Sequence, residues 1–324
     1  MTDREHQPPA DLAALPKCEL HVHLEGTVRP ATLEEFAARE GVSIPRSFSD
    51  LNSFVETYMA ATRVMTQPGD YARLVREYCE DAARNGVRYA ELEVSPALTP
   101  RTIDCFYEAS EAAAKERDVV VRFSLGLGRV MPAEIKMRAI DATKDVPGIV
   151  ALGLGGPEEG YPSAPFTEVF AEARRRGWHS APHAGENAGP ASVREVLDEL
   201  GAERIQHGVR AVEDEALVAE LARRRIGLAV CPTSNVLLGV ASAIDEHPLR
   251  PLWEAGVLVS VNTDDPGFFG CHLTGEYAIA GRLLGLDRVG YARLAGNAIE
   301  TSFAPETLKA QLRAEVVDWA GPAS

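Results

Sequence analysis

Short apolar segments alternate along the chain with longer stretches that have a helical pattern. Eight of the apolar segments are typical of strands, and seven of them follow residue 85. The stretches between them, such as residues 192–202, repeat apolar residues at the spacing of one helix face. The predicted strands cover residues 18–26, 87–96, 119–128, 149–156, 178–186, 204–208, 226–235 and 257–265.

Eight alternating β and α units with nearly continuous apolar strands predict an α/β fold, a closed parallel (β/α)8 TIM barrel. An open, doubly wound sheet is the competing arrangement, but nothing in the chain resembles a Gly-rich dinucleotide turn. No low-complexity linker divides the sequence, so we expect one barrel domain over residues 1–324. The polar, Pro-containing residues 1–15 predict a mobile tail.

The stretch between the first two strands is too long for a single crossover. Residues 47–65 have a Ser/Asp-rich start that would cap a helix, followed by apolar residues at helical spacing. An ordinary peripheral helix would give the same pattern. Because active sites of barrels lie on the loops after the strands, we also expect residues 27–66 to form a helical lid over the site.

Charge and cysteine content narrow the class of partner. The formal net charge is −15, from 48 acidic and 33 basic residues, which argues against nucleic acid, because binding to phosphates relies on Lys and Arg. Five scattered cysteines are typical of a reduced, cytoplasmic protein. No apolar segment is long enough to span a bilayer or to act as a signal peptide. We therefore expect a cytoplasmic protein with a small-molecule partner, and no oligomeric state is indicated.

Titratable residues recur at the carboxyl ends of the predicted strands. His21 and His23 are two positions apart, so on a strand their side chains share a face. His183 and His207 end two later strands, and Asp264 ends the last one. Because the carboxyl end of a barrel is its active face, we expect these side chains to lie together.

Three histidines and a carboxylate that leave one position for water form a typical hydrolytic metal site. We assign His21, His23, His183 and Asp264 to the metal, with zinc as the ion that best suits imidazole, although iron or cobalt could also bind. His207 would orient or deprotonate the water, and Glu186, three residues after a ligand, suits a proton donor. On a regular strand Asp265 would face away from Asp264, but the turn at Pro266 can redirect it.

The motifs PKCELHVHLEG, HAGE, HG, CPTSN and NTDDP, in this order, resemble those of the adenosine and adenine deaminase family of metal-dependent hydrolases. The resemblance runs from Pro16 to about residue 310. It implies a zinc-bearing barrel that replaces the 6-amino group of a purine by oxygen and releases ammonia. It also implies the same four metal ligands. Glu186 would protonate N1, His207 would orient the attacking hydroxide, and Asp265 would bind N7.

On the substrate side the chain departs from the family pattern. Glu25 stands where adenosine deaminases usually carry the Asp that meets the ribose 5′-hydroxyl, while Glu occurs in relatives similar to adenine deaminase. The segment 151–160 keeps Gly156, which corresponds to the N3 contact, and Glu158, but has Gly153 and Pro157 at positions that are commonly acidic. The added glycines are expected to make room for a larger 5′ substituent, and CPTSN to shape the pocket wall.

The leading hypothesis is a zinc-dependent deaminase of adenosine or a 5′-modified adenine nucleoside, with His23, Glu25, Gly156 and Asp265 binding the substrate. The alternatives are deamination of adenine, or of 6-aminodeoxyfutalosine, an intermediate of menaquinone biosynthesis. A barrel that hydrolyses esters, lactones or phosphoesters is disfavoured because no Lys at a strand end could bridge two metals. A catalytically silent binding protein on the same scaffold is a more remote alternative.

Overall fold

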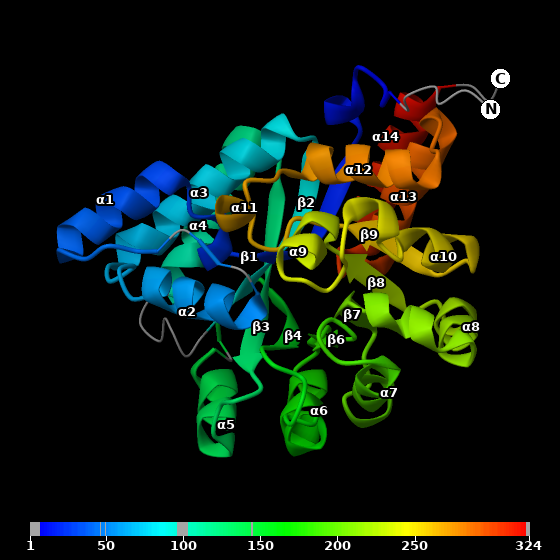
Figure 1. Ribbon diagram of the computed structural model, residues 1–324. Helices are drawn as coiled ribbons and strands as arrows, with labels where there is room; N and C mark the ends of the chain where they lie inside the picture. The colour runs from blue at the N-terminus through cyan, green and yellow to red at the C-terminus, as the bar shows by residue number, and fades with distance from the viewer. Residues whose placement is uncertain (1–6, 46, 49, 96–102, 144, 322–324) are drawn as a thin grey trace.

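The computed structural model describes residues 7–45, 47, 48, 50–95, 103–143 and 145–321. Within these residues, parallel strands form a barrel and helices surround it (Figure 1). The strands are β1 (Lys17–His23), β2 (Val87–Val94), β3 (Val120–Gly128), β4 (Ile149–Gly155), β5 (His179–Ser180), β6 (His183–Ala184), β7 (Arg204–His207), β8 (Gly227–Val230) and β9 (Leu258–Val261). The first five pair in sequence order, as do the last four.

Two junctions close these two sheets into one barrel. The backbone N–H of His23 donates to Asp264 O (2.8 Å) and that of Asp264 donates to His21 O (3.1 Å), which joins the segment after β9 to β1. The other junction is at Ala181, which lies between β5 and β6. Its N–H donates to Leu152 O of β4 (3.0 Å). The predicted closed barrel is confirmed, and the open sheet is wrong.

Proline explains two differences between the predicted and the observed strands. The predicted strand 178–186 is two short strands, because Pro182 between them has no N–H to donate to a ladder. The predicted strand 226–235 ends at Val230, and Pro232 begins a helix instead, at the first helical position that proline favours. Residue 96, the predicted end of the second strand, lies outside the described residues.

The helices cover the outside of the barrel, and the segments after the strands cover its carboxyl end. The α-helices are α1 (Pro30–Glu40), α2 (Leu51–Thr62), α3 (Pro68–Arg84), α4 (Ile103–Arg117), α5 (Ala133–Ala142), α6 (Thr167–Arg175), α7 (Pro190–Glu199), α8 (Glu215–Arg224), α9 (Pro232–Leu237), α10 (Leu249–Glu254), α11 (Pro266–Phe269), α12 (Leu273–Leu284), α13 (Arg288–Thr301) and α14 (Glu306–Ala320). In the described part of the chain, none of the helices combines the length and the apolar character that crossing a membrane requires.

The predicted helical insertion lies between β1 and β2. The predicted insertion 27–66 contains α1 and α2, and Asp50 caps α2 by accepting a hydrogen bond from the N–H of Ser53 (2.9 Å). From α2, Phe54 packs against Leu238 and Phe269, which belong to segments following β8 and β9. This apolar cluster holds α2 beside the carboxyl end of the barrel.

The N-terminal segment is partly ordered against the barrel. Residues 1–6 of the predicted mobile tail lie outside the described residues, whereas Leu12 and Leu15 are buried. The ammonium group of Lys17 donates to the carbonyl oxygens of Leu12 (2.6 Å), Leu15 (2.8 Å) and Asn85 (2.9 Å). These bonds tie the segment to the start of β1.

Candidate active site

The predicted site residues lie together at the carboxyl end of the barrel. His21 and His23 come from the end of β1, His183 from β6, His207 from the end of β7, and Asp264 from the segment after β9. All of them except His21 line one cavity of about 220 Å³, as do Glu186, Asp265 and Gly156. The barrel therefore brings together residues from opposite ends of the chain, such as His21 and Asp264.

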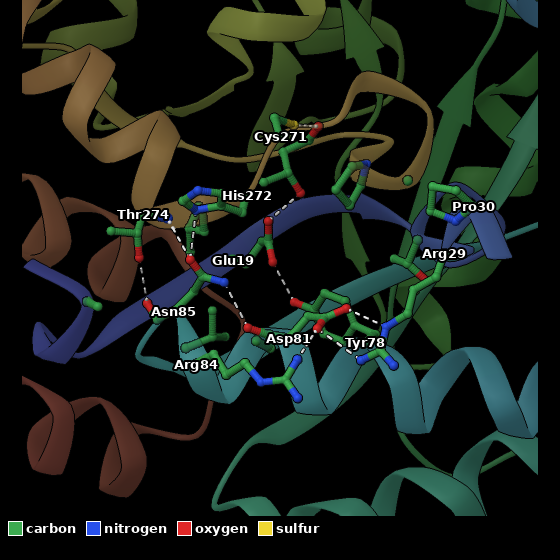
Figure 2. A pocket seen from close by; sticks show the side chains of 18 residues that line it. Glu19, Arg29, Pro30, Tyr78, Asp81, Arg84, Asn85, Cys271, His272 and Thr274 are labelled. Carbon is green, nitrogen blue, oxygen red and sulfur yellow. Dashed lines mark hydrogen bonds and ion pairs between the residues drawn. The ribbon is translucent and has the colours of Figure 1, made fainter. Parts of the chain in front are cut away.

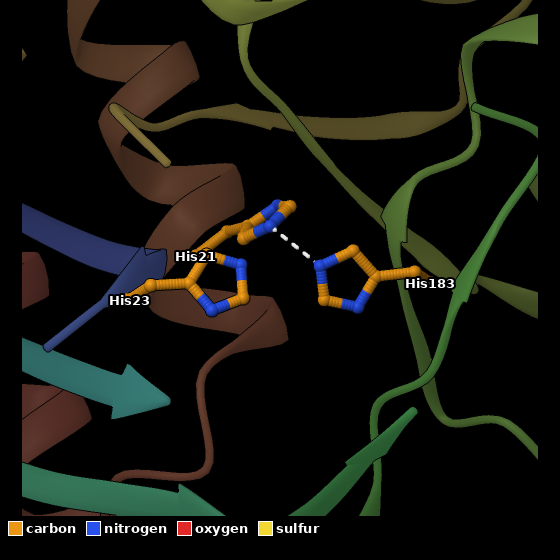
Figure 3. Close-up of side chains that lie close together, drawn as sticks. All are labelled: His21, His23 and His183. Atoms are coloured by element: carbon orange, nitrogen blue, oxygen red, sulfur yellow. Dashed lines mark hydrogen bonds between the residues drawn. The ribbon is translucent and has the colours of Figure 1, made fainter. Parts of the chain in front are cut away.

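The imidazole rings of His21, His23 and His183 converge on one point (Figure 3). Nε2 of His21 lies 3.1 Å from Nε2 of His183, while their Nδ1 atoms lie 3.1 Å from the carbonyl oxygens of Ala229 and Leu154. Since a carbonyl oxygen can only accept, both Nδ1 atoms carry the proton, and in the neutral rings both Nε2 atoms are bare. Two facing lone pairs repel unless a cation lies between them, so this donor set fits a metal ion.

Asp264 supplies a carboxylate to the same cluster. Its Oδ1 lies 3.3 Å from Nε2 of His21 and 3.2 Å from Nε2 of His23, and the Ser234 hydroxyl donates to its Oδ2 (2.7 Å). Burial opposes ionisation, but the neighbouring histidines hold the pKa of Asp264 well below its usual value. A backbone φ of 63°, in the left-handed region that non-glycine residues avoid, directs the side chain inward. Three imidazoles and one carboxylate suit zinc.

Glu186 and His207 face one another beside the histidine cluster. Oε1 of Glu186 lies 3.5 Å from Nε2 of His207, which is 3.8 Å from Oδ2 of Asp264. Burial, together with the negative charge of Asp264, raises the pKa of Glu186 well above its usual value. Burial lowers the pKa of His207 to about 3. Glu186 can therefore carry a proton where an ordinary carboxylate would not, and His207 is neutral.

Glu158 fixes the turn that carries Glu186. Its carboxylate accepts hydrogen bonds from the backbone N–H groups of Gly185 (2.8 Å), Glu186 (3.0 Å) and Asn187 (2.9 Å), and from the hydroxyl of Ser192. Hydrogen bonds to an ionised acceptor are stronger than neutral ones. The acidic residue at position 158 thus supports the turn that carries Glu186.

The end of the last barrel segment redirects Asp265 into the cavity. Its side chain lies against Gly26, where an added Cβ would come within 1.9 Å of Oδ1. Oδ1 has no hydrogen-bond partner among the described residues although Asp265 is only 2% exposed. Burial and the charge of Asp264 raise the pKa of Asp265 well above its usual value. A carboxyl oxygen without a partner in a cavity is suited to binding a polar ligand atom.

Glu25 is already engaged by helix α2. The Tyr58 hydroxyl donates to Oε2 of Glu25 (3.1 Å), and the N–H of Ser95 donates to Oε1 (3.3 Å). Glu25 is 1% exposed, while Tyr58 lines the cavity. The residue predicted to meet the sugar therefore lies behind a side chain of the insertion.

Glu93 is an acidic residue of the cavity that the sequence interpretation overlooked. It pairs across β2 and β1 with His23, and its Oε1 lies 3.8 Å from Nδ1 of that ring. A Cβ at Gly126 or Gly153 would come within 2.4 or 2.3 Å of the Glu93 carboxylate. The prediction that Gly153 makes room for a 5′ substituent is therefore wrong, because Glu93 occupies that space. Glu91 and Glu93 have the same i, i+2 spacing as the two histidines, and this signal could have identified the inward-facing pair.

A larger cavity of about 470 Å³ lies between α3 and the segment around α11 (Figure 2). It is lined on one side by Tyr78 and Asp81 of α3 and on the other by Cys271 and His272. None of the predicted site residues is among the described residues that line it. The chemistry predicted from the sequence is therefore confined to the smaller cavity.

Comparisons with known proteins agree with this geometry. A family model described as adenosine deaminase matches residues 16–319. The chain is 40% identical to the aminodeoxyfutalosine deaminase of Streptomyces coelicolor, over 95% of this chain and 85% of the relative. The structure of an adenine deaminase from Arthrobacter aurescens matches with a TM-score of 0.91 at 31% identity, over 95% of this chain and all of the other. An amidohydrolase from Burkholderia ambifaria with bound zinc matches with a TM-score of 0.88 at 26% identity, over 98% and 94% of the two chains.

Proposed function

Because the chain belongs to the adenosine deaminase family and is a deaminase of adenine or an adenine derivative, we propose that it removes the 6-amino group of a 5′-modified adenine nucleoside with the help of one zinc ion. The observation that carries this proposal is the convergence of three imidazoles and Asp264 beside a buried, proton-bearing Glu186. The zinc-bound amidohydrolase from Burkholderia ambifaria supports the choice of metal.

In this proposal His21, His23, His183 and Asp264 hold the ion. Zinc, when bound, supplies a Lewis acid that makes water nucleophilic at neutral pH. Glu186 delivers a proton to N1 of the purine ring, which makes C6 electrophilic. His207 orients the incoming oxygen from the other side of the Glu186 carboxyl group, from which its Nε2 is 3.5 Å away.

The remaining polar groups of the cavity hold the purine. The unpaired Oδ1 of Asp265 binds N7 through the proton that its raised pKa retains. Gly156, with φ of 91°, lines the cavity without a side chain, so its backbone can approach N3. These contacts orient C6 toward the metal-binding side chains, and they are independent of the 5′ group.

The 5′-modified substrate is supported by the relative from Streptomyces coelicolor, which is named for deamination of aminodeoxyfutalosine. In this reading α2 acts as a lid: Tyr58 releases Glu25 when the nucleoside enters, and Glu25 then meets the sugar. The first half of α2 packs through Phe54 on a small apolar cluster, whereas Ala61 anchors its end in the main core, so the movement is confined to the first half of the helix.

A second candidate is deamination of free adenine. The hydrogen bond between Tyr58 and Glu25 favours it, because that bond closes the cavity at the position where a ribose would be recognised. The adenine deaminase from Arthrobacter aurescens has a closely similar fold. In this reading Tyr58 remains bonded to Glu25 throughout turnover.

A substrate panel tests the proposal. The purified protein, loaded with zinc, is assayed by ultraviolet absorption with adenine, adenosine, methylthioadenosine and aminodeoxyfutalosine. The proposal predicts the highest kcat/KM for a 5′-modified nucleoside. A higher value for adenosine would contradict the 5′ modification, and a preference for adenine would establish the second candidate. Full activity after removal of all metal by a chelator would contradict the role of zinc.

A further inference from the structure

A chain of hydrogen bonds leads from the first turn of α10 to His207. The backbone N–H of Leu249 lies 3.1 Å from Nδ1 of His247. Nε2 of His247 lies 3.1 Å from Oδ1 of Asn235, and Nδ2 of Asn235 lies 3.1 Å from Nδ1 of His207. We propose that His247 and Asn235 are positioning residues that keep the proton of His207 on Nε2. This inference deepens the proposed function and rests on it for the catalytic role of His207.

The direction of every bond in this chain follows from its backbone end. An N–H can only donate, so the N–H of Leu249 makes Nδ1 of His247 an acceptor. The proton of the neutral His247 ring is then on Nε2, which donates to the amide oxygen of Asn235. With its oxygen used in this way, Asn235 turns its NH₂ group toward His207, whose Nδ1 must accept. The proton of a neutral His207 is therefore on Nε2.

The three side chains of this hydrogen-bond chain are buried. The exposed fractions are 4% for His247, 0% for Asn235 and 1% for His207, so water has little access to replace a lost bond. Both ends of His247 are occupied within this chain of bonds, by the N–H of Leu249 at Nδ1 and by Oδ1 of Asn235 at Nε2. In such surroundings an unmade hydrogen bond costs the full desolvation of the group.

The consequence is that His207 acts as a donor in the active site. Its Nε2–H points toward the space between Oε1 of Glu186 (3.5 Å) and Oδ2 of Asp264 (3.8 Å). A donor there stabilises an oxygen that carries negative charge, whereas a base would need a bare Nε2. The sequence alone left both roles open for His207. The hydrogen-bond chain favours orientation over proton abstraction.

Asn235 and His247 both belong to the helical segment that follows β8. Asn235 lies on α9, whose start at Pro232 replaces the end of the predicted strand, and the same helix carries Ser234, which bonds Asp264. His247 comes twelve residues after Asn235 and two residues before the start of α10, and it is hydrogen-bonded to both Asn235 and Leu249. One short helix thus supports the carboxylate ligand and the orienting imidazole.

The first measurement is the tautomer of His207 in the full-length zinc-loaded protein. Nitrogen-15 spectra of histidine-labelled protein distinguish a protonated from a bare ring nitrogen, and a His207→Gln sample identifies the signals of His207. We expect protonated Nε2 and bare Nδ1 at pH 7. A protonated Nδ1 with a bare Nε2 would overturn the proposal, whether or not any adenine derivative is deaminated. Conversely, the expected tautomer in a protein that deaminates none of the panel would overturn the proposed function alone.

The second measurement uses variants of the chain. Asn235→Asp replaces the donor facing Nδ1 by an acceptor, so the proton should move to Nδ1, and kcat should fall about 10²–10³-fold, as for loss of one oxyanion donor, with a smaller change in KM. His247→Phe should give a mixture of tautomers, and His247→Gln, whose amide can still donate to Asn235, should restore most of the activity. His179→Gln, at a partly exposed histidine paired with Glu203, is the matched control. Unchanged tautomer and kcat in a folded Asn235→Asp or His247→Phe protein would overturn the proposal.

Discussion

The clearest test of the catalytic assignment is the replacement of Glu186 by Gln. Gln has the same length, and the hydrogen bond from the backbone N–H of residue 186 to Glu158 (3.0 Å) does not involve the side chain. The turn should therefore keep its shape. What the variant loses is the proton that burial and Asp264 hold on the carboxyl group.

The expected loss follows from the surroundings of this carboxyl group. General acid catalysis contributes about 10²–10⁴-fold, or about 3–5 kcal/mol of barrier. Glu186 is 6% exposed, so water can hardly act in its place, and we expect kcat to fall toward the upper end of this range. Since a raised pKa means that the acid form is lost only as pH rises through that pKa, activity should decline on the alkaline side. The Gln variant should lack that decline.

The assay combines turnover, followed by the ultraviolet absorption of the purine, with zinc content by atomic absorption. Glu199→Gln, an exposed position at the end of the helix after this turn, is the control and should retain both activity and metal. A Glu186→Gln protein that keeps its zinc and turns over within about threefold of the unmodified protein would refute the assigned proton transfer.

Three further predictions concern the residues around the proposed zinc site and the lid. Ser234→Ala should lower zinc affinity about tenfold or more, since a hydrogen bond to an ionised group contributes about 1.5–3 kcal/mol; equal affinity in a chelator competition would contradict this. Glu93→Gln should release zinc faster, because a carboxylate beside His23 raises its basicity and such partners contribute about 10–100-fold; an unchanged release rate would exclude this role. Tyr58→Phe frees Glu25 and should lower KM for nucleosides but not for adenine; equal changes for both would argue against the lid.

The barrel, and the gathering of the predicted side chains at one end of it, could be predicted from the sequence, because strand direction in a parallel barrel determines which strand ends meet. The spacing of His21 and His23 needed only the alternation of a strand. Such rules apply within regular strands and helices, and they fail where a strand is interrupted or ends. Pro182 and Pro232 mark these places, and a reading that had treated each proline as a strand end would have predicted both breaks.

The contacts within the cavity depend on distances that no sequence pattern contains. Gly153 was expected to enlarge the substrate space, but a glycine reports only that its own side chain is absent. Whether the space goes to a ligand or to another residue depends on the neighbouring strand, and here the side chain of Glu93 fills it. Likewise, the role of Glu25 could not be inferred from its position after β1, because its partner Tyr58 comes from a helix 33 residues further along.

The arrangement of charges in this cavity also explains why so many buried acids can be tolerated. Glu186, Asp264 and Asp265 lie within one small space, and three ionised carboxylates there would repel strongly. The histidines favour ionisation of Asp264, and the charge of Asp264 in turn favours the protonated forms of Glu186 and Asp265. In the proposed function, Asp264 would thus bind the metal as a carboxylate, while Glu186 and Asp265 would keep protons for the purine. The division of labour proposed for deamination is therefore the one that the electrostatics of the cavity favour before any substrate binds.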